Sequence, residues 1–386
     1  MIKAKYDWKL DETVLSEDFL KISKKHKLDE LTSRVLYQRG IHDESEIEKF
    51  LKPNLEDLHD PFLLHDMEKA TQRILSAIEQ GENILIYGDY DADGMTAASV
   101  MKFTDGYGPN LDVYQYYINN ENINLIITVD NGVAGVEAIA WAQENGVDVI
   151  ITDHHSMPDQ MPNAYAIIHP EHPESQYPFK YLAGVGVAFK VACALLEYAP
   201  REMLDLVAIG TIADMVSLTD ENRILVAHGL KVLAQTERAG LQELMKYAGV
   251  DFDKVTEETV GFQIAPRLNA LGRLDDPNPA IELLTGWDED EAHEIAKMID
   301  QKNSERKDIV EKIHNEALAM LTDEPVQILY HKDWHKGVLG IVAGRLLEQI
   351  HKPVIMLAEE EGILRGSARS IDSFDIFKML KRLKKQ

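Results

Sequence analysis

The residues most able to carry chemistry lie in the stretch Ile84–Thr96, which reads ILIYGDYDADGMT. An apolar run is followed there by three aspartates within five positions, Asp89, Asp91 and Asp93. Such a run is typical of a buried parallel strand, and open α/β sheets bind their ligands at the carboxyl ends of the strands. Carboxylates crowded at one place oppose each other's ionisation unless a cation neutralises them. The stretch therefore predicts a divalent metal site.

Two further apolar runs end in side chains of the same kind. INLIITV is followed by Asp130, and VDVIIT is followed by Asp153, His154 and His155. A fourth acid, Asp214, follows the apolar residues IGTIA. Each acid alone can equally serve as a helix cap. Their recurrence favours a shared site, because the carboxyl ends of parallel strands meet at one edge of a sheet.

These side chains together offer hard oxygen ligands and one imidazole: Asp91, Asp93, Asp130, His154 and Asp214. The mixture suits Mn²⁺, and Mg²⁺ less ideally, whereas structural zinc favours cysteines. A carboxylate that bridges two cations, Asp130 or Asp91, makes a two-metal site that activates water against a phosphate. His154 is expected to ligate through one nitrogen, and His155 to face the phosphate as a hydrogen-bond donor or acid. For Asp89 three roles stay open: ligand, support for a ligand, or helix cap.

Residues able to hold phosphates lie far along the chain. They are Arg267, Asn269 and Arg273 in GFQIAPRLNALGRL, and Ser367 and Arg369 in RGSARS. Arginine binds phosphate through paired hydrogen bonds, although ion pairs with carboxylates are the alternative for each one. The chain has 40 Lys and Arg against 66 Asp and Glu, a net charge of −26, which argues against a broad nonspecific grip on nucleic acid. Phosphates would need metals or clustered arginines.

The elements that must position these residues divide the chain into four parts. Residues 1–75 are expected to be helical, and residues 76–235 to form an α/β catalytic domain. Residues 236–320 hold an interdomain segment and a long charged helix over 288–321, and residues 321–386 a smaller β-α-β unit. In the catalytic domain, Gly94 is expected to lead into a helix over 95–101, followed by too few residues for another strand. We therefore expect the chain to lack residues near Met101–Thr104.

The composition is that of an ordinary globular protein, with 45% hydrophobic and 27% charged residues. No apolar run is long enough to span a bilayer, and the first residues do not read as a signal peptide. The single cysteine, Cys193, rules out an internal disulfide and fits a reducing cytoplasm. We expect no association with membranes.

A series of motifs in one order carries a resemblance to a known family: GDYDADG, VDNG, TDHH, IGTIADMV, PRLNALGR, WHKGVLGIVAGRL and RGSARS. The chain resembles the DHH phosphoesterase superfamily, and within it the bacterial exonucleases that degrade single-stranded DNA from the 5′ end. The resemblance implies an α/β fold in which a parallel-sheet DHH domain is joined by a long helix to a smaller α/β DHH-associated domain, with the active site in the cleft between them.

The resemblance also implies roles for particular residues. The metal ligands of the family fall on Asp91, Asp93, Asp130, His154 and Asp214, with Asp89 nearby, and His155 takes the catalytic histidine position. Arg273, Ser367 and Arg369 match positions that hold DNA phosphates, including the 5′-terminal one. Two Mn²⁺ or Mg²⁺ ions are the implied cofactors.

The implied activity is release of 5′-mononucleotides from single-stranded DNA in repair and recombination, by a cytoplasmic monomer. Single-strand-binding protein and a RecQ-type helicase are the implied partners. Two alternatives stand beside it: a DHH phosphodiesterase of nanoRNA or cyclic dinucleotides, and a non-catalytic DHH scaffold. The glycine-rich GGH-type motif of the family does not follow Ser370, and an oligonucleotide-binding domain is absent, so we expect the DHH-associated domain here to be incomplete.

Overall fold

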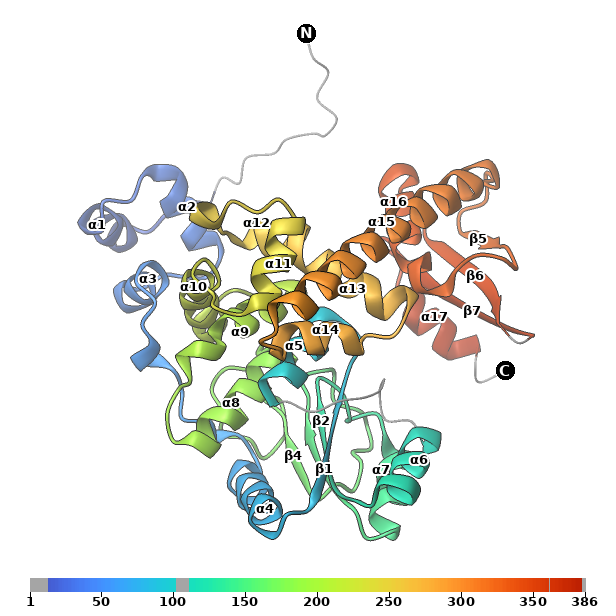
Figure 1. Cartoon of the computed structure of the whole chain (residues 1–386). Helices are drawn as coiled ribbons and strands as arrows, with labels where there is room; N and C mark the ends of the chain where they lie inside the picture. Colours follow the sequence, from blue (N-terminus) through green and yellow to red (C-terminus); the bar gives the residue numbers. More distant parts are fainter. Residues whose placement is uncertain (1–12, 102–110, 361, 384–386) are drawn as a thin grey trace.

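A four-stranded parallel sheet, in the order β1-β2-β3-β4, forms the centre of the computed structural model, which describes residues 13–101, 111–360 and 362–383 (Figure 1). The strands are β1 (Asn83–Gly88), β2 (Ile123–Val129), β3 (Asp148–Thr152) and β4 (Ala166–Ile168). Gly88 pairs with Val129 and Val129 pairs with Thr152, so the first three strands end at one edge. These three strands confirm the prediction. The three-residue strand β4 was not predicted, because so short a run shows no periodicity.

Helices cover both faces of this sheet. Successive strand residues point to opposite sides, so Ile86 and Ile127 enter one core cluster while Leu85 and Ile126 enter another. The helices against the first face are α4 (Met67–Gln80), α5 (Ala92–Met101) and α8 (Gly184–Leu196), and those against the second are α6 (Leu111–Glu121) and α7 (Val136–Glu144). Burial on both faces explains why the strands read as continuous apolar runs.

Helix α5 begins at Ala92, three residues earlier than predicted. Asp91 causes the early start, because its Oδ1 atom accepts hydrogen bonds from the N–H groups of Asp93 and Gly94, at 3.0 and 3.1 Å. Gly94 therefore lies inside the first turn, where a Cβ atom would come within 2.5 Å of the Asp89 carbonyl oxygen. The aspartates of the motif thus span the junction between the strand and the helix.

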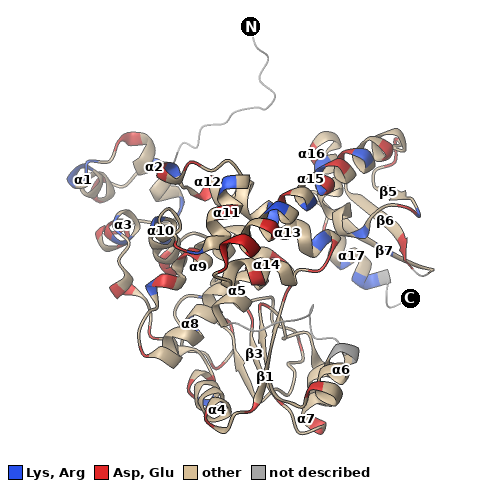
Figure 2. Cartoon of the chain, in the orientation of Figure 1, with Lys and Arg blue, Asp and Glu red and all other residues tan. Residues whose placement is uncertain are grey.

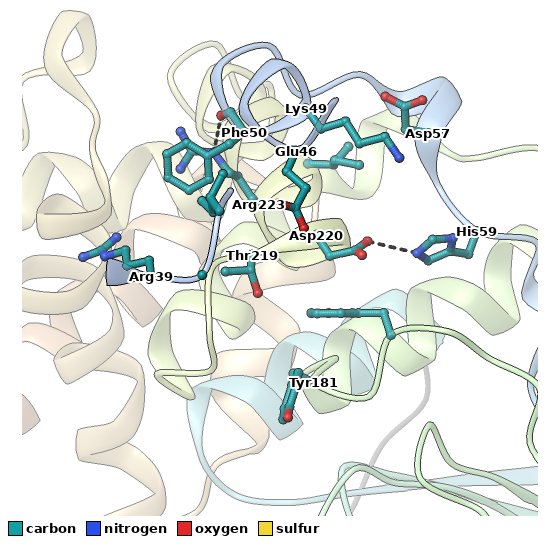
Figure 3. Close-up of a pocket in the computed structure, with 14 residues that line it drawn as sticks. Arg39, Glu46, Lys49, Phe50, Asp57, His59, Tyr181, Thr219, Asp220 and Arg223 are labelled. Carbon is teal, nitrogen blue, oxygen red and sulfur yellow. Dashed lines mark hydrogen bonds and ion pairs between the residues drawn. The ribbon is translucent and has the colours of Figure 1, made fainter. Parts of the chain in front are cut away.

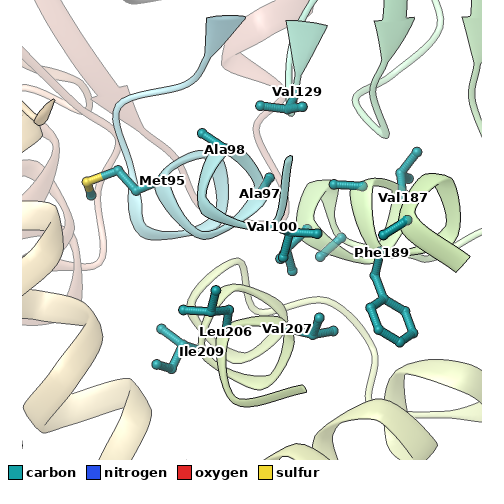
Figure 4. Packing of buried hydrophobic residues seen from close by; sticks show 14 of the residues in the cluster. Met95, Ala97, Ala98, Val100, Val129, Val187, Phe189, Leu206, Val207 and Ile209 are labelled. Carbon is teal, nitrogen blue, oxygen red and sulfur yellow. The ribbon is translucent and has the colours of Figure 1, made fainter. Parts of the chain in front are cut away.

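Close packing of three helices carries a distant acid to the sheet edge. Helix α9 (Leu204–Ala213) lies against α5 and α8, and Figure 4 shows side chains of all three helices in one core, with Leu206 of α9 near Val100 of α5. The approach is tight at Gly210, where a Cβ atom would lie 2.3 Å from a side-chain oxygen of α5. Helix α9 ends directly before Asp214, so this acid arrives from a helix end and not from a strand.

The region before the sheet is helical, as predicted. Helices α1 (Glu17–Lys25), α2 (Glu30–Gln38) and α3 (Glu44–Leu51) enclose a small core of their own around Phe19 and Leu36. After α9 come α10 (Asp220–Leu233), α11 (Ala239–Tyr247), α12 (Glu257–Thr259), the π-helical turn η5 (Val260–Ile264), α13 (Ala265–Leu274) and α14 (Asn278–Thr285). Short 3-10 turns are η1 (Leu55–Asp57), η2 (Pro61–Leu63), η3 (Arg201–Met203) and η4 (Phe252–Lys254).

One long helix, α15 (Glu289–Ala319), joins the sheet domain to a smaller C-terminal unit, as predicted (Figure 1). Its first half buries Ala296 and Ile299 in the large core, and its second half buries Val310 and Ile313 in the C-terminal core. At 31 residues the helix is about 46 Å long. The two cores are therefore tied to one rigid element.

The C-terminal unit is a three-stranded mixed sheet in the order β5-β6-β7. Its elements are β5 (Gln327–Tyr330), η6 (Lys336–Val338), α16 (Leu339–Ile350), β6 (Val354–Glu360), β7 (Ile363–Arg369) and α17 (Ile376–Leu383). Strands β5 and β6 are parallel, as a β-α-β unit requires, while β7 is antiparallel to β6. The segment RGSARS thus lies largely on a strand, which places Ser367 and Arg369 on the same face of the sheet.

Among the described residues, no helix combines the length and the apolar character needed to cross a membrane. The predicted lack of residues near Met101–Thr104 falls on positions 102–110, which lie outside the described residues. Helix α6 begins at Leu111, directly after these positions.

Candidate metal centre

All of the predicted metal-binding residues meet at the carboxyl edge of the parallel sheet. Their candidate ligand atoms form three groups, each within 4.8 Å: Asp89, Asp91 and Asp130; Asp93, His154 and Asp214; and Asp130, His154 and His155. Strand ends deliver Asp89, Asp130 and the histidines, and the end of α9 delivers Asp214. Asp130 belongs to two of the groups, as expected of a carboxylate between two cations.

Two buried atoms at the centre of this cluster face each other without a hydrogen bond. Asp130 Oδ1 and His154 Nε2 lie 3.0 Å apart, but within the described residues neither has a partner in hydrogen-bonding geometry. Asp130 is 2% exposed, and its backbone has φ of +60°. A buried polar atom without a partner costs about 1–3 kcal/mol. Strain and an unsatisfied oxygen at the same residue indicate a site shaped for a ligand.

The start of helix α8 packs so closely against Asp130 that only glycine fits at position 184. A Cβ atom at Gly184, the first residue of α8, would lie 2.4 Å from Asp130 Oδ1. The same helix start donates to Asp93, whose two carboxylate oxygens accept the N–H groups of Gly184 and Val185 at 2.7 and 2.8 Å. These hydrogen bonds fix the orientation of Asp93, which is 1% exposed. The positive end of the α8 dipole also favours the charged form of its carboxylate.

The two histidines have different environments. Burial, and then the neighbouring His155, lowers the pKa of His154 to about 4, so its imidazole is neutral and able to ligate a cation. The side chain of His155 is 54% exposed, and its Nδ1 atom lies 2.8 Å from Asp153 Oδ1. That hydrogen bond raises the pKa of His155 to about 9.

Asp153 was not predicted as a site residue, and it is the group that organises both histidines. It is 1% exposed and accepts hydrogen bonds from the N–H groups of Val133, His154 and His155. Burial would raise its pKa, but the hydrogen bond from the His155 ring and those from the backbone hold it below the ordinary value. The signal was present in the sequence, since Asp153 stands directly before the two histidines.

Burial and mutual repulsion raise the pKa values of the clustered aspartates, so their ionised forms need a compensating positive charge. Burial, followed by the charge of Asp91, raises the pKa of Asp89 to about 6 and that of Asp214 to about 6. Burial raises the pKa of Asp93 and of Asp130 still further above the ordinary carboxyl value, with neighbouring aspartates adding to the shift. Divalent cations would reverse this repulsion, and carboxylates with one neutral imidazole fit Mn²⁺ or Mg²⁺.

A separate cavity of about 370 Å³ lies between the N-terminal helices and α10 (Figure 3). Its lining includes Arg39, Phe50, Tyr181 and Arg223, and none of the predicted metal or phosphate residues. Acids and bases share this lining, and Asp220 there pairs with His59 at 2.9 Å. This cavity is therefore lined by other residues than those of the carboxylate cluster.

Comparison with known proteins connects this geometry to a family. Residues 83–211 match the DHH family, N-terminal domain, and residues 323–386 match the DHHA1 domain. The single-stranded-DNA-specific exonuclease RecJ of Haemophilus influenzae is 38% identical, over 92% of this chain and 68% of its own length. The chain belongs to the RecJ family.

Other RecJ proteins agree with this assignment. Bacillus subtilis RecJ is 44% identical over 98% of this chain and 51% of its own length. The crystal structure of RecJ in complex with Mn²⁺ from Thermus thermophilus superposes with a TM-score of 0.84 at 28% identity, covering 95% of this chain and 55% of that one. The chain thus spans about half the length of these two RecJ proteins.

The predicted phosphate-binding residues lie in two places of the RecJ fold. Arg273 in α13 reaches the C-terminal unit, where its Nη1 atom donates to the Gly337 carbonyl at 3.1 Å. Ser367 and Arg369 flank the start of α16, because both lie close to the position that a Cβ atom of Gly340 would take. Figure 2 shows Lys and Arg positions interspersed with Asp and Glu along α15 and in the C-terminal unit.

For Arg267, the ion-pair alternative is the arrangement found. Its side chain is 12% exposed, and its Nε atom lies 2.9 Å from Asp300 Oδ1. Its Nη1 atom donates to the Gln263 carbonyl at 2.7 Å. These contacts fix the guanidinium against α15, and its phosphate-binding role stays a prediction.

Arg306 of α15 was missed by sequence reasoning. Its buried Nε atom has no partner among the described residues, and its Nη2 atom donates to Asn303 at 3.0 Å. Burial, and then the charges of Arg273 and Arg345, lowers its pKa. Arg306 is therefore a partly buried cation that lies within electrostatic reach of Arg273 of α13 and Arg345 of α16. No sequence pattern marks Arg306, because Asp288–Leu321 is charged throughout.

Proposed function

We propose that this chain is a metal-dependent 5′→3′ exonuclease that hydrolyses single-stranded DNA to 5′-mononucleotides in DNA repair and recombination. The observation that carries the proposal is the cluster of five aspartates and His154, with Asp130 Oδ1 and His154 Nε2 buried and unpartnered at its centre. Membership of the RecJ family, whose relatives are named single-stranded-DNA-specific exonucleases, favours DNA over nanoRNA or cyclic dinucleotides.

Two cations are proposed to occupy the cluster, Mn²⁺ or Mg²⁺, as the Mn²⁺ complex of the Thermus relative supports. One would be held by Asp89, Asp91 and Asp130, and the other by Asp93, His154 and Asp214, with Asp130 between them. When bound, such a pair polarises the scissile phosphate and lowers the pKa of a water so that hydroxide is available. The residues of the chain would hold both ions at the carboxyl edge of the parallel sheet.

His155 acts on the phosphate and not on the cations in this proposal. With its pKa raised to about 9, its imidazolium is present at neutral pH, half-exposed and held by Asp153. It can donate a hydrogen bond to the phosphate or give the departing 3′ oxygen its proton. The bond broken is the one between phosphorus and that oxygen, and water supplies the new oxygen on the phosphate.

The remaining assignments follow from the same proposal. Arg273, Ser367 and Arg369 would anchor the DNA strand, with Asn269 and Arg267 as further predicted contacts, in a cleft between the DHH and DHH-associated domains. We assign residues 1–75 to the N-terminal segment, 76–235 to the catalytic domain, 236–320 to the connection and 321–386 to the DHH-associated domain. Single-strand-binding protein and a RecQ-type helicase as partners, a monomeric state and a cytoplasmic location are proposed with the activity.

Digestion of end-labelled DNA tests this function. In Mn²⁺, a 5′-labelled single strand should release its label first as a mononucleotide, while a 3′-labelled strand shortens gradually and blunt duplex is spared. Label released first from the 3′ end, or equal cleavage of duplex, would contradict the proposed polarity or selectivity. A dinucleotide hydrolysed faster than the long strand would favour the small-substrate alternative.

A further inference from the structure

The first turn of α5, which carries the metal-binding aspartates, is completed by a residue from another helix. A helix start leaves its first N–H groups without partners inside the helix. Asp91 Oδ1 accepts those of Asp93 and Gly94, at 3.0 and 3.1 Å. The N–H group of Ala92 is taken instead by Asn269 Oδ1 of α13, at 2.7 Å and 177 positions along the chain.

The backbone of α13 also touches this loop directly. A Cβ atom at Gly272 would lie 2.0 Å from the Tyr90 carbonyl oxygen, so only glycine permits the approach. Asn269 and Gly272 are three residues apart and therefore lie on one face of α13. The loop of Tyr90, Asp91 and Ala92 is thus held between the sheet edge and this helix face.

We propose that Asn269 is a positioning residue of the metal centre, which holds Ala92 N–H and thereby sets the direction of Asp91 and Asp93. This inference rests on the proposed function. With Ala92 fixed, Asp91 keeps its Oδ1 atom on the helix start while its carboxylate stays grouped with those of Asp89 and Asp130. Groups that orient metal ligands through hydrogen bonds typically change metal affinity by about 10- to 100-fold when removed.

The inference concerns the amide oxygen of Asn269, whereas the predicted phosphate contact would use its amide nitrogen. The two roles separate by substitution. Asn269→Asp keeps an acceptor for Ala92 N–H and removes the NH₂ donor, whereas Asn269→Leu keeps the size and removes both. If Asn269 positions the metal ligands, the two variants should differ in metal affinity. If it only contacts DNA through its NH₂ group, both variants should lose that contact equally.

The test measures Mn²⁺ affinity by calorimetry in the absence of DNA, for the parent, Asn269→Asp, Asn269→Leu and Asn269→Ala. Asn145→Ala is the matched control, since Asn145 also bonds a backbone group, the Trp141 carbonyl, but at the exposed end of α7. We expect Asn269→Ala and Asn269→Leu to weaken Mn²⁺ binding about tenfold or more, and Asn269→Asp and Asn145→Ala to stay within about threefold of the parent. Turnover of single-stranded DNA by Asn269→Leu should fall in kcat with KM little changed.

Parent-like Mn²⁺ affinity in the folded Asn269→Leu variant would overturn the inference, as would equal losses in Asn269→Leu and Asn269→Asp. Melting curves identify the folded variants, and the isosteric leucine serves if the alanine variant does not fold. A parent chain that binds no Mn²⁺ would contradict the proposed function instead, so the two failures are distinguishable.

Discussion

The Nδ1 atom of His155 lies 2.8 Å from Oδ1 of Asp153, and Asp153 is itself fixed by three backbone N–H groups. The buried carboxylate thus keeps a proton on a half-exposed imidazole beside the metal cluster. An aspartate that directly precedes two histidines therefore serves two functions, fixing the backbone of both and setting the charge of the His155 ring.

Replacing Asp153 by Asn should move the alkaline limb of the pH–rate profile. The pKa of His155 is raised to about 9 from an ordinary 6.5, so a reaction that needs its imidazolium slows as pH rises through about 9. Without the carboxylate that fall should begin roughly two pH units lower. Bound cations lower both values together, so parent and variant are compared at one Mn²⁺ concentration. An unshifted limb in a variant with parent-like melting would exclude an acid role for His155.

Mn²⁺ should stabilise the chain more at about pH 7.5 than at about pH 5. The pKa values of Asp89 and Asp214 are raised to about 6, so the contribution of these two groups to the stability of the metal-free fold is fully present below their ordinary 3.8 and is lost as pH rises through about 6. Cations cancel the repulsion that appears in this range. At about 100 times its Kd each ion contributes about 2.7 kcal/mol, which melting curves detect. A shift in Tm that is independent of pH would count against the cluster as the binding site.

Asp130→Asn should stabilise the metal-free chain while abolishing the gain from Mn²⁺. Burial, and then the neighbouring aspartates, raises the pKa of Asp130 well above its ordinary value, so a neutral amide removes the cost of ionising this side chain. The same change removes the ligand shared by the two proposed ions. The comparison is made by thermal melting with Mn²⁺ and with a chelator. A variant that is less stable than the parent without metal and still gains from Mn²⁺ would contradict this account.

Gly184→Ala should reduce Mn²⁺ affinity about tenfold or more, because its Cβ atom would lie 2.4 Å from Asp130 Oδ1 and displace that carboxylate. Gly344→Ala in α16 is the matched control. A Cβ atom there meets nothing within 4 Å, and alanine should stabilise the helix by about 0.5–1 kcal/mol. Titration calorimetry and melting curves of both variants check the pair. Equal Mn²⁺ affinity in the two would show that the contact at Gly184 is unimportant.

Arg306→Ala and Arg267→Ala should separate DNA binding from stability. Arg306 is repelled by Arg273 and Arg345, so its loss should weaken single-stranded DNA binding about tenfold while leaving the free energy of unfolding nearly unchanged. Arg267 is paired with Asp300, so its loss should cost about 1–3 kcal/mol of stability. Fluorescence anisotropy with labelled DNA in Ca²⁺ and urea unfolding measure the two effects. The reverse pattern would assign the phosphate contact to Arg267.

Those residues of the cluster that directly follow an apolar run could be predicted from the sequence. Asp130 and His154 follow apolar strands, and parallel strands bring their ends together. Asp214 was found by the same pattern, although it arrives from a helix. The contact between Asn269 and Ala92 leaves no local trace, because it depends on how α13 lies across a loop 177 positions earlier. Arg306 was hidden for a different reason, since its burial and its nearness to the charges of Arg273 and Arg345 arise only when three helices pack.

The most direct test compares the parent with Asp91→Ala in the rate of mononucleotide release from 5′-phosphorylated single-stranded DNA in Mn²⁺. If the carboxylate cluster is the catalytic centre, the parent degrades the strand from its 5′ end, and Asp91→Ala loses about 10³-fold or more in rate while melting like the parent. Parent-like nuclease activity in a folded Asp91→Ala variant would contradict the account.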